Sequence, residues 1–434
     1  MSQNIGQYIN SILKSNLFRH ISIVFLWDNI AKFVGIVTTI ILIRMLPKED
    51  YAMYTFFWAA AMFFVGFVSD GIDMAYVRFA AEEYSIKRKM PNDIFVFSLL
   101  LCLSVFIVLF PLILTFNRQI SSLMFKSTLY VRPIFLGFMA AVGLFFINMI
   151  SRYYQVQEKY KKAGIIFNLQ KVIFLLFLFV IIVLGKLNFL SIAIVQIAVI
   201  SIFGVIFIAA ILKNDLLKQK IILNSHRFVF FLNASFWLIL YFVCLALFSQ
   251  LDVFMISRLM TSDDLADYGV AFKYYGFLML MFPAVKTVLK VRTSKIDIVQ
   301  SIEKQKMFFR KWMKTMIIFS IPTIAIVILF SGYIMNLLNG EKYGASIAPF
   351  KILALSSMCS YIFSPNTDIF RAMKKYFILF CFGFVALVIN FCGNLLLIPI
   401  YGITGAAVTT LVSYLIVNVS ATMYIMVRKE DACP

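Results

Sequence analysis

Residues 94–116 read IFVFSLLLCLSVFIVLFPLILTF, a run of 23 residues without one charged side chain. About 20 consecutive apolar residues allow an α-helix to cross the roughly 30 Å hydrocarbon core of a bilayer. The segment must be helical there, because lipid offers no hydrogen-bond partners to an open backbone. This run therefore predicts a transmembrane helix.

The rest of the 434-residue chain has the same character. It is 62% hydrophobic and only 14% charged, with a mean hydropathy of +0.93, whereas soluble domains average about 45–50% apolar and about 25% charged residues. The predicted fold class is an all-α membrane protein in which residues 1–20 form an amphipathic segment on the cytoplasmic surface. Twelve transmembrane segments are predicted: 21–43, 52–73, 94–116, 133–151, 164–184, 188–212, 228–251, 266–289, 315–338, 346–367, 376–398 and 402–427.

Lysine and arginine divide unequally between the two sides of the membrane. With twelve spans, 27 of the 40 lie on the side of both termini, 8 lie on the other side and 5 lie within or at the edges of spans. Cytoplasmic loops carry the excess of basic residues in membrane proteins. We therefore predict cytoplasmic termini, and the net charge of +20 reflects orientation rather than nucleic-acid binding.

The two halves of the chain resemble each other. Arg44–Tyr54 reads RMLPKEDYAMY after the first span, and Arg258–Val270 reads RLMTSDDLADYGV after the seventh. QEKY at Gln157–Tyr160 and MKKY at Met373–Tyr376 follow the fourth and tenth spans. Six spans is an even number, so a duplicated half inserts in the same sense as the first. We predict two six-helix lobes, residues 21–220 and 221–434.

A few charged residues interrupt the predicted spans. Asp28 and Lys32 are four residues apart and share one helix face, while Lys171 and Lys273 have no acidic residue one turn away. A charge near the midplane costs about 2.5–3.5 kcal/mol, so these side chains should face a polar interior. Asp28 and Lys32 can alternatively be a pair that neutralises itself. An isolated lysine needs water, a carboxylate on another helix or an anionic ligand.

Further charged residues are predicted at the ends of spans. Arg152 and Arg371 occupy related places in the two halves, and each is either a phosphate ligand or an interfacial anchor. Asp70, Asp73 and Arg78 surround a glycine at the end of the second span, where they form a possible gate or simply a polar helix end. Two more carboxylates, Asp252 and Asp368, are expected at the membrane interface.

Motifs of metal and enzyme chemistry are missing from the sequence. Five of the six cysteines lie in apolar runs, there is no C-x-x-C pair, and the two histidines are far apart. The sequence also lacks H-E-x-x-H, G-x-S-x-G and the nucleotide-binding G-x-x-x-x-G-K-[ST] pattern. We predict a protein that is not an enzyme and that uses no cofactor or metal, apart from a possible coupling ion.

The block Leu397–Thr410, LIPIYGITGAAVTT, resembles the polysaccharide transporter family of O-antigen flippases (Wzx-type). RMLPKEDY at Arg44–Tyr51 and the tripeptide Asp267–Gly269 are similar to the same family. It belongs to the multidrug/oligosaccharidyl-lipid/polysaccharide exporter superfamily, which includes MATE drug exporters and the lipid II flippase. The resemblance implies a MATE-like fold in which two six-helix lobes enclose a central cavity.

It also implies a function. The expected substrate is an undecaprenyl-pyrophosphate-linked oligosaccharide, moved from the cytoplasmic to the outer leaflet of the bacterial inner membrane by alternating access. Such transport would serve surface polysaccharides such as the O-antigen of lipopolysaccharide, beside the polymerase and glycosyltransferases of that pathway. Basic side chains would then contact the pyrophosphate, and Asp28 would exchange a proton or sodium ion as in an antiporter. The headgroup residues chosen here are Lys32, Lys171, Lys273, Arg152 and Arg371.

Two alternatives from other classes remain. A MATE-type exporter of small organic cations should have an anionic cavity, but lysines outnumber acids within these spans. A membrane-embedded glycan polymerase usually needs a large outward loop, and the longest outward loop here lies near residues 116–132.

Overall fold

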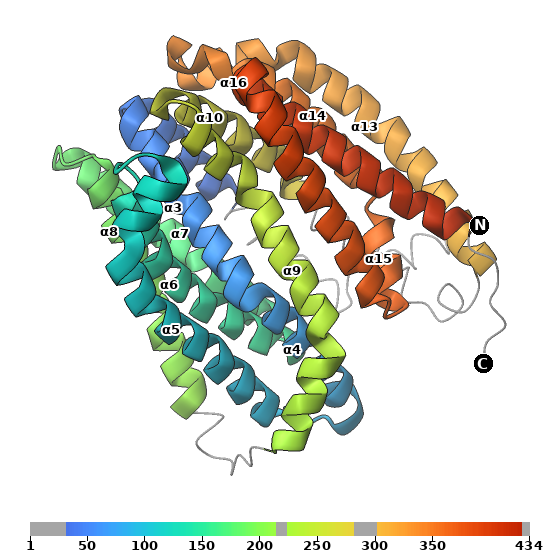
Figure 1. Cartoon of the computed structure of the whole chain (residues 1–434). Coiled ribbons are helices and arrows are strands. Elements are labelled where there is room, and N and C mark those ends of the chain that lie inside the picture. The colour runs from blue at the N-terminus through green and yellow to red at the C-terminus, as the bar shows by residue number, and fades with distance from the viewer. Residues whose placement is uncertain (1–31, 214–223, 282–301, 428–434) are drawn as a thin grey trace, which may run out of the picture. The chain divides into compact units, whose positions relative to one another are not determined.

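The computed structural model describes residues 32–213, 224–281 and 302–427, and every regular element in these ranges is a helix (Figure 1). The expected all-α fold is thereby confirmed. Residues 32–45 are helical, and the following elements are α3 (Lys48–Val65), η1 (Gly66–Asp70), α4 (Gly71–Lys87), α5 (Asn92–Phe125), α6 (Val131–Val156), α7 (Tyr160–Val183), α8 (Phe189–Ile211), α9 (Ser225–Leu259), α10 (Ser262–Leu278), η3 (Met279–Met281), α13 (Ile302–Asn339), η4 (Glu341–Ser346), α14 (Ile347–Ile362), α15 (Pro365–Ala372) and α16 (Tyr376–Val427).

The predicted spans agree with these helices. Nine segments of the described residues are long and apolar enough to cross a membrane. One of them, α16, contains two predicted spans, and two further spans are helical in their described parts, residues 32–43 and 266–281. Each of the twelve predicted segments is thus helical over most of its described length. The predicted amphipathic segment 1–20 lies outside the described residues.

The two arms of α16 form a helical hairpin. Gly402 at its tip has φ +59°, a left-handed conformation that glycine adopts without a steric penalty. A Cβ atom on Gly405 would lie 2.3 Å from the carbonyl oxygen of Leu397, and one on Gly393 would lie 2.4 Å from a methyl carbon of Thr409. The glycines of the I-P-I-Y-G-I-T-G-A-A block are therefore explained by a tight turn between closely packed helices.

The helix that contains the second predicted span is longer than expected. It runs without a break from Lys48 to Lys87, well beyond the predicted end at residue 73. Immediately before Gly71 it includes one π-helical turn, η1, a feature that is frequent at functional sites.

Two glycines of neighbouring helices pack closely against α3. A Cβ atom on Gly269 would lie 2.4 Å from Thr55 Oγ1, and one on Gly137 would lie 2.8 Å from the Ala60 side chain.

The chain divides into two compact units. Of the described residues, unit 1 holds 32–41, 72–107 and those within 139–231, and unit 2 holds 42–71, 108–138 and those from 232 onward. In unit 1, α7 packs along α8, and Arg227 forms ion pairs with Glu83 and, at 2.9 Å, with Asp93. In unit 2, α14 lies beside both α13 and α16 (Figure 1). The division into lobes 21–220 and 221–434 stays a prediction.

Candidate functional site

A buried carboxylate, Asp252, is the centre of a polar cluster inside unit 2. Its side chain accepts hydrogen bonds from Tyr268 Oη at 2.5 Å, Thr410 Oγ1 at 2.6 Å and Asn394 Nδ2 at 2.7 Å. Asn390 completes the cluster by donating to Thr410 at 3.1 Å and accepting from Asn394 at 3.2 Å. Asp252 is only 6% exposed, and the other four residues are buried.

The three donors to Asp252 are neutral, and no basic side chain among the described residues pairs with it. An isolated carboxylate inside a membrane protein is costly, so its charge has to be balanced by a proton or by a bound cation. The cluster also contains amide and hydroxyl oxygens, the ligands that hard cations prefer. One of them, Asn394 Oδ1, is buried and has no hydrogen-bond partner in the described part of the chain. The arrangement suits exchange of a proton or a small cation.

Three helices bring the cluster together. Asp252 lies on α9, Tyr268 on α10, and the remaining residues on the two arms of the α16 hairpin. Asn390 and Asn394 are one helical turn apart and therefore share a face. Asn390 can reach Thr410 because the small residues of the hairpin let the two arms approach closely.

A cavity of about 300 Å³ lies in the same unit. Arg371 lines it, with its guanidinium carbon 5.4 Å from the ring centroid of Phe242 and 5.9 Å from that of Tyr241. Arg371 Nε is buried, and no described residue accepts a hydrogen bond from it. The lining combines aromatic rings with polar groups such as Asn366 and Asn418, and Asn366 Nδ2 donates to the backbone carbonyl of Asn418 at 3.0 Å. Such a cavity offers a charged donor for an anion and polar groups for hydroxyls.

The cavity and the Asp252 cluster are neighbours along two helices. On α9, Phe248 of the cavity lining is one turn before Asp252. On α16, Tyr414 of the lining is one turn after Thr410, and its ring packs against that of Phe248 at 5.2 Å. The carboxylate and the cavity are therefore one helical turn apart on α9, and Thr410 and the cavity are one turn apart on α16.

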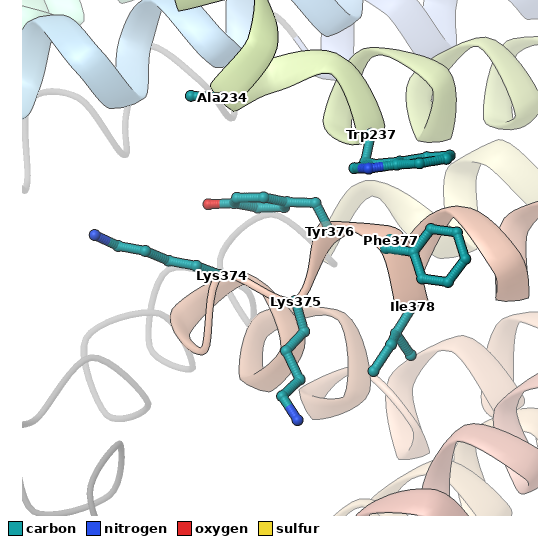
Figure 2. A pocket seen from close by; sticks show the side chains of 7 residues that line it. All are labelled: Ala234, Trp237, Lys374, Lys375, Tyr376, Phe377 and Ile378. Atoms are coloured by element: carbon teal, nitrogen blue, oxygen red, sulfur yellow. The ribbon is translucent and has the colours of Figure 1, made fainter. Parts of the chain in front are cut away.

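A second, open groove lies at the turn from α15 to α16 (Figure 2). Its lining includes Trp237 of α9 and the sequence Lys374–Ile378, and the rings of Trp237 and Phe377 are 4.7 Å apart. Figure 2 shows the side chains of Lys374 and Lys375 extending away from Trp237. Aromatic rings beside lysines are typical of the membrane interface, and this turn lies on the side predicted to be cytoplasmic.

The predicted headgroup residues are distributed over both units. Lys32, Lys171 and Arg152 belong to unit 1 and are half-buried, and Arg152 donates to Gln155 Oε1 at 3.0 Å. Arg371 and Lys273 belong to unit 2, where the Lys273 ammonium lies 5.6 Å from the ring centroid of Trp58. Arg371 is the member of this set that lines the 300 Å³ cavity. A common role for all five stays a prediction.

The remaining predicted site residues are the ion-coupling residue Asp28 and the gate residues Asp70, Asp73 and Arg78. Asp28 lies outside the described residues. Asp73 and Arg78 are in α4 and belong to unit 1, whereas Asp70 is the last residue of η1 and belongs to unit 2. Asp73 is 2% exposed, which shows that it is no simple polar helix end. The gate stays a prediction, and a π-helical turn, η1, directly precedes Gly71.

Comparison with known protein families identifies the family of this chain. The model of a family described as "Polysaccharide biosynthesis protein" matches residues 17–289, which is more than half of the chain. The chain belongs to this polysaccharide biosynthesis family. No curated protein sequence is significantly similar to it.

Solved structures show which fold this polysaccharide biosynthesis protein adopts. It is similar to the lipid II flippase MurJ in an inward closed conformation, with 15% identity, a TM-score of 0.76 and coverage of 93% of this chain and 87% of MurJ. An inward-facing multidrug resistance MATE family transporter of the MOP superfamily gives 12% identity, a TM-score of 0.73 and coverage of 93% and 94%. A Vibrio cholerae MATE transporter gives 14% identity, a TM-score of 0.63 and coverage of 93% and 96%. The protein has the fold shared by these transporters.

Sequence reasoning missed the Asp252 cluster of this polysaccharide biosynthesis protein. The predicted span ended at residue 251, so Asp252 was expected at the interface, but α9 continues to Leu259. Asp368 is also buried, at 9% exposed, in the first turn of α15. Both carboxylates are buried inside the protein, and their place at the membrane interface stays a prediction. The available signal was the pair Asn390 and Asn394, two amides at helical spacing in an otherwise apolar run.

Proposed function

We propose that this protein is a flippase that moves an undecaprenyl-pyrophosphate-linked oligosaccharide from the cytoplasmic to the outer leaflet by alternating access, driven by a proton or sodium gradient. The observation that carries the proposal is Arg371: a guanidinium with an unsatisfied Nε, inside a polar and aromatic cavity, in a member of a polysaccharide biosynthesis family. O-antigen and other surface polysaccharides are the pathways that such a substrate would serve.

The chemistry of the substrate fits the groups around the cavity. A pyrophosphate is a strong acceptor of charge-assisted hydrogen bonds, and the planar guanidinium of Arg371 presents paired donors to it. Sugar hydroxyls require polar partners such as Asn366 and Asn418, and sugar ring faces pack against aromatic side chains. Lys374 and Lys375 on the neighbouring groove are placed to attract the anionic headgroup first.

The basic residues Lys32, Lys171, Lys273 and Arg152 complete this proposal as further headgroup contacts. Asp70, Asp73 and Arg78 remain the proposed gate around the π-helical turn. Lipid tails stay in the bilayer while the headgroup crosses, so the residues that matter most are the polar and charged ones that replace water around it.

Asp252 is the proposed ion-coupling residue, alongside Asp28. A proton or sodium ion can drive transport only if it binds the inward-facing and outward-facing states with different affinity. Asp252 meets one requirement for such a role, because its buried carboxylate gains or loses a charge in direct reach of the helices that line the cavity. Binding of the ion would favour the arrangement of α9, α10 and α16 in which all donors face the carboxylate.

A cellular experiment tests the proposal. In a strain that lacks this gene, lipid-linked oligosaccharide should accumulate in the inner leaflet and surface glycan should be lost, and the intact gene should reverse both. Arg371→Ala at normal abundance should restore less than about a tenth of the surface glycan, because a charge-assisted contact to phosphate is worth about 1.5–3 kcal/mol. Arg371→Lys should be intermediate, and the exposed Arg118→Ala is the matched control.

Other results would assign another function. Unchanged surface glycan together with new sensitivity to small organic cations would identify an exporter. Short glycan units accumulating in the outer leaflet, rather than the inner one, would identify a polymerase. Full activity of Arg371→Ala would remove the proposed role of the cavity.

A further inference from the structure

Arg44 stabilises the end of a helix from the other half of the chain. It lies in the last turn of the helix that covers residues 32–45, and it donates through Nε to the carbonyl of Leu338 and through a terminal nitrogen to the carbonyl of Leu337, each at 2.5 Å. These two residues are in the last turn of α13, the third span of the second half. All three residues belong to unit 2.

Arg258 makes the same contact in the opposite direction. It lies in the last turn of α9 and donates to the carbonyls of Leu123 at 3.0 Å and Met124 at 2.6 Å. Those residues are in the last turn of α5, the third span of the first half. Arg258 lies 214 residues after Arg44 in the sequence. The two carbonyl groups that Arg44 contacts likewise lie 214 residues after the two that Arg258 contacts. The contact is therefore reciprocal, as in the isologous interface of a two-fold dimer.

The physical basis of each contact is simple. The last carbonyls of a helix have no partner within the helix, and they carry the negative end of the helix dipole. A guanidinium supplies both a positive charge and two donors in a fixed plane, so it can satisfy two such carbonyls together, which a lysine ammonium does less well.

We propose that Arg44 and Arg258 form a reciprocal latch that holds the outer ends of the two halves together, and that both contacts must break before the transporter opens outward. The inference rests on the proposed alternating access and adds the device that controls it. Both arginines lie on the predicted outer side, where basic residues are otherwise rare. The latch gives these two arginines a role on the side where the orientation rule places few basic residues.

Other contacts of unit 2 surround the latch and support its assignment to a closed outer end. Lys48 pairs with the buried Asp267 at 3.2 Å, and Lys342 donates to the carbonyl of Leu46. Each of these contacts again joins a residue of the first half to one of the second. Four of the eight basic residues predicted on the outer side, Arg44, Lys48, Arg258 and Lys342, therefore join the two halves.

The proposal predicts a graded effect on outward opening. Both arginines are exposed, so water competes for their hydrogen bonds. Loss of either contact should therefore shift the equilibrium between the outward-closed and outward-open states by about fivefold, the effect of one ordinary hydrogen bond. The two contacts lie in different helices and break in the same movement, so their effects should multiply to about twenty-five-fold in the double variant. Lysine at either position should give a smaller shift, because it retains the charge but not the paired donors.

Cysteine accessibility measures this equilibrium directly. Thr55→Cys is the reporter, since Thr55 is 5% exposed and packs against Gly269 at the junction of the two halves. The native cysteines are replaced by alanine, and a membrane-impermeant maleimide is added outside intact cells. The rate of labelling should rise about fivefold with Arg44→Ala or Arg258→Ala and about twenty-five-fold with both. Arg132→Ala, an exposed arginine on the same predicted side, is the matched control.

The outcomes separate the latch from the transport function. Labelling rates of the double variant equal to those of Arg132→Ala would overturn the latch, as would a double variant no faster than the single ones. Should alanine reduce the abundance of the protein, the two lysine variants decide by the same comparison. The measurement needs no substrate, so a failure of the proposed glycan transport leaves this result intact, and the reverse also holds.

Discussion

Replacement of Asp252 by asparagine separates the charge of the buried cluster from its shape. Asp252→Asn should leave the fold intact and abolish the response of transport to the driving ion. The amide oxygen can take the place of Oδ2 and accept from the hydroxyls of Tyr268 and Thr410. Its NH₂ group then faces Asn394, which can turn its amide and present Oδ1, an atom that has no hydrogen-bond partner among the described residues.

The magnitudes distinguish this variant from alanine. Asp252→Ala would leave three buried donors, on Tyr268, Thr410 and Asn394, without an acceptor. Each costs about 1–3 kcal/mol, so the total of about 3–9 kcal/mol approaches the whole stability of a typical protein. Asp252→Asn keeps an acceptor for the hydroxyls of Tyr268 and Thr410. The turned Asn394 amide loses its contact with Asn390, so one donor stays without an acceptor and the free energy of unfolding should fall by about 1–3 kcal/mol, less than in Asp252→Ala.

The assay uses purified protein in vesicles with an imposed sodium or proton gradient. The native protein should move lipid-linked oligosaccharide faster when one of the two gradients is present, and Asp252→Asn should move it at the same rate with and without that gradient. Thermal unfolding in detergent serves as the control for folding. The reasoning is refuted if Asp252→Asn responds to the gradient as the native protein does, or if it loses as much stability as Asp252→Ala.

Three further predictions follow from close contacts and charge. Gly269→Ala should reduce the free energy of unfolding by about 1–3 kcal/mol, because its Cβ atom would lie 2.4 Å from Thr55 Oγ1. Adding Thr55→Ala should restore most of the loss, and absence of this rescue would contradict the close packing of the two residues. Gly405→Val should prevent accumulation of the protein in membranes, because a Cβ atom there meets a backbone carbonyl at 2.3 Å, and normal abundance on immunoblots would argue against the hairpin. Arg371→Ala should weaken binding of inorganic pyrophosphate by about tenfold or more, measured by calorimetry, and unchanged affinity would place the anion elsewhere.

The spans could be predicted because the bilayer imposes a simple rule on sequence. A charge-free run such as 94–116 can only be a membrane helix, and the helices found agree with all twelve runs in their described parts. The ends were less predictable. The second predicted span, ended at residue 73, continues as a helix to Lys87, because polar residues outside the hydrocarbon core remain helical without an apolar signal.

The candidate site was only partly predictable. Lys273 and Arg371 could be chosen because a basic residue stands out in or beside an apolar run. Asp252 could not be chosen in this way, because its importance comes from neutral partners on two other helices, up to 158 residues away. The latch was visible as a repeat at Arg44 and Arg258, but the sequence did not indicate that each arginine caps a helix of the opposite half.

Transbilayer movement of the lipid-linked glycan by the purified protein tests the central claim most directly. Vesicles containing undecaprenyl-pyrophosphate-linked oligosaccharide are treated with a glycosidase that cannot cross the membrane, with and without the protein. We expect the protein to make the inner-leaflet glycan accessible, so that cleavage proceeds nearly to completion, and we expect Arg371→Ala to slow this second phase. Cleavage that stops at the outer-leaflet fraction, as in protein-free vesicles, would contradict it.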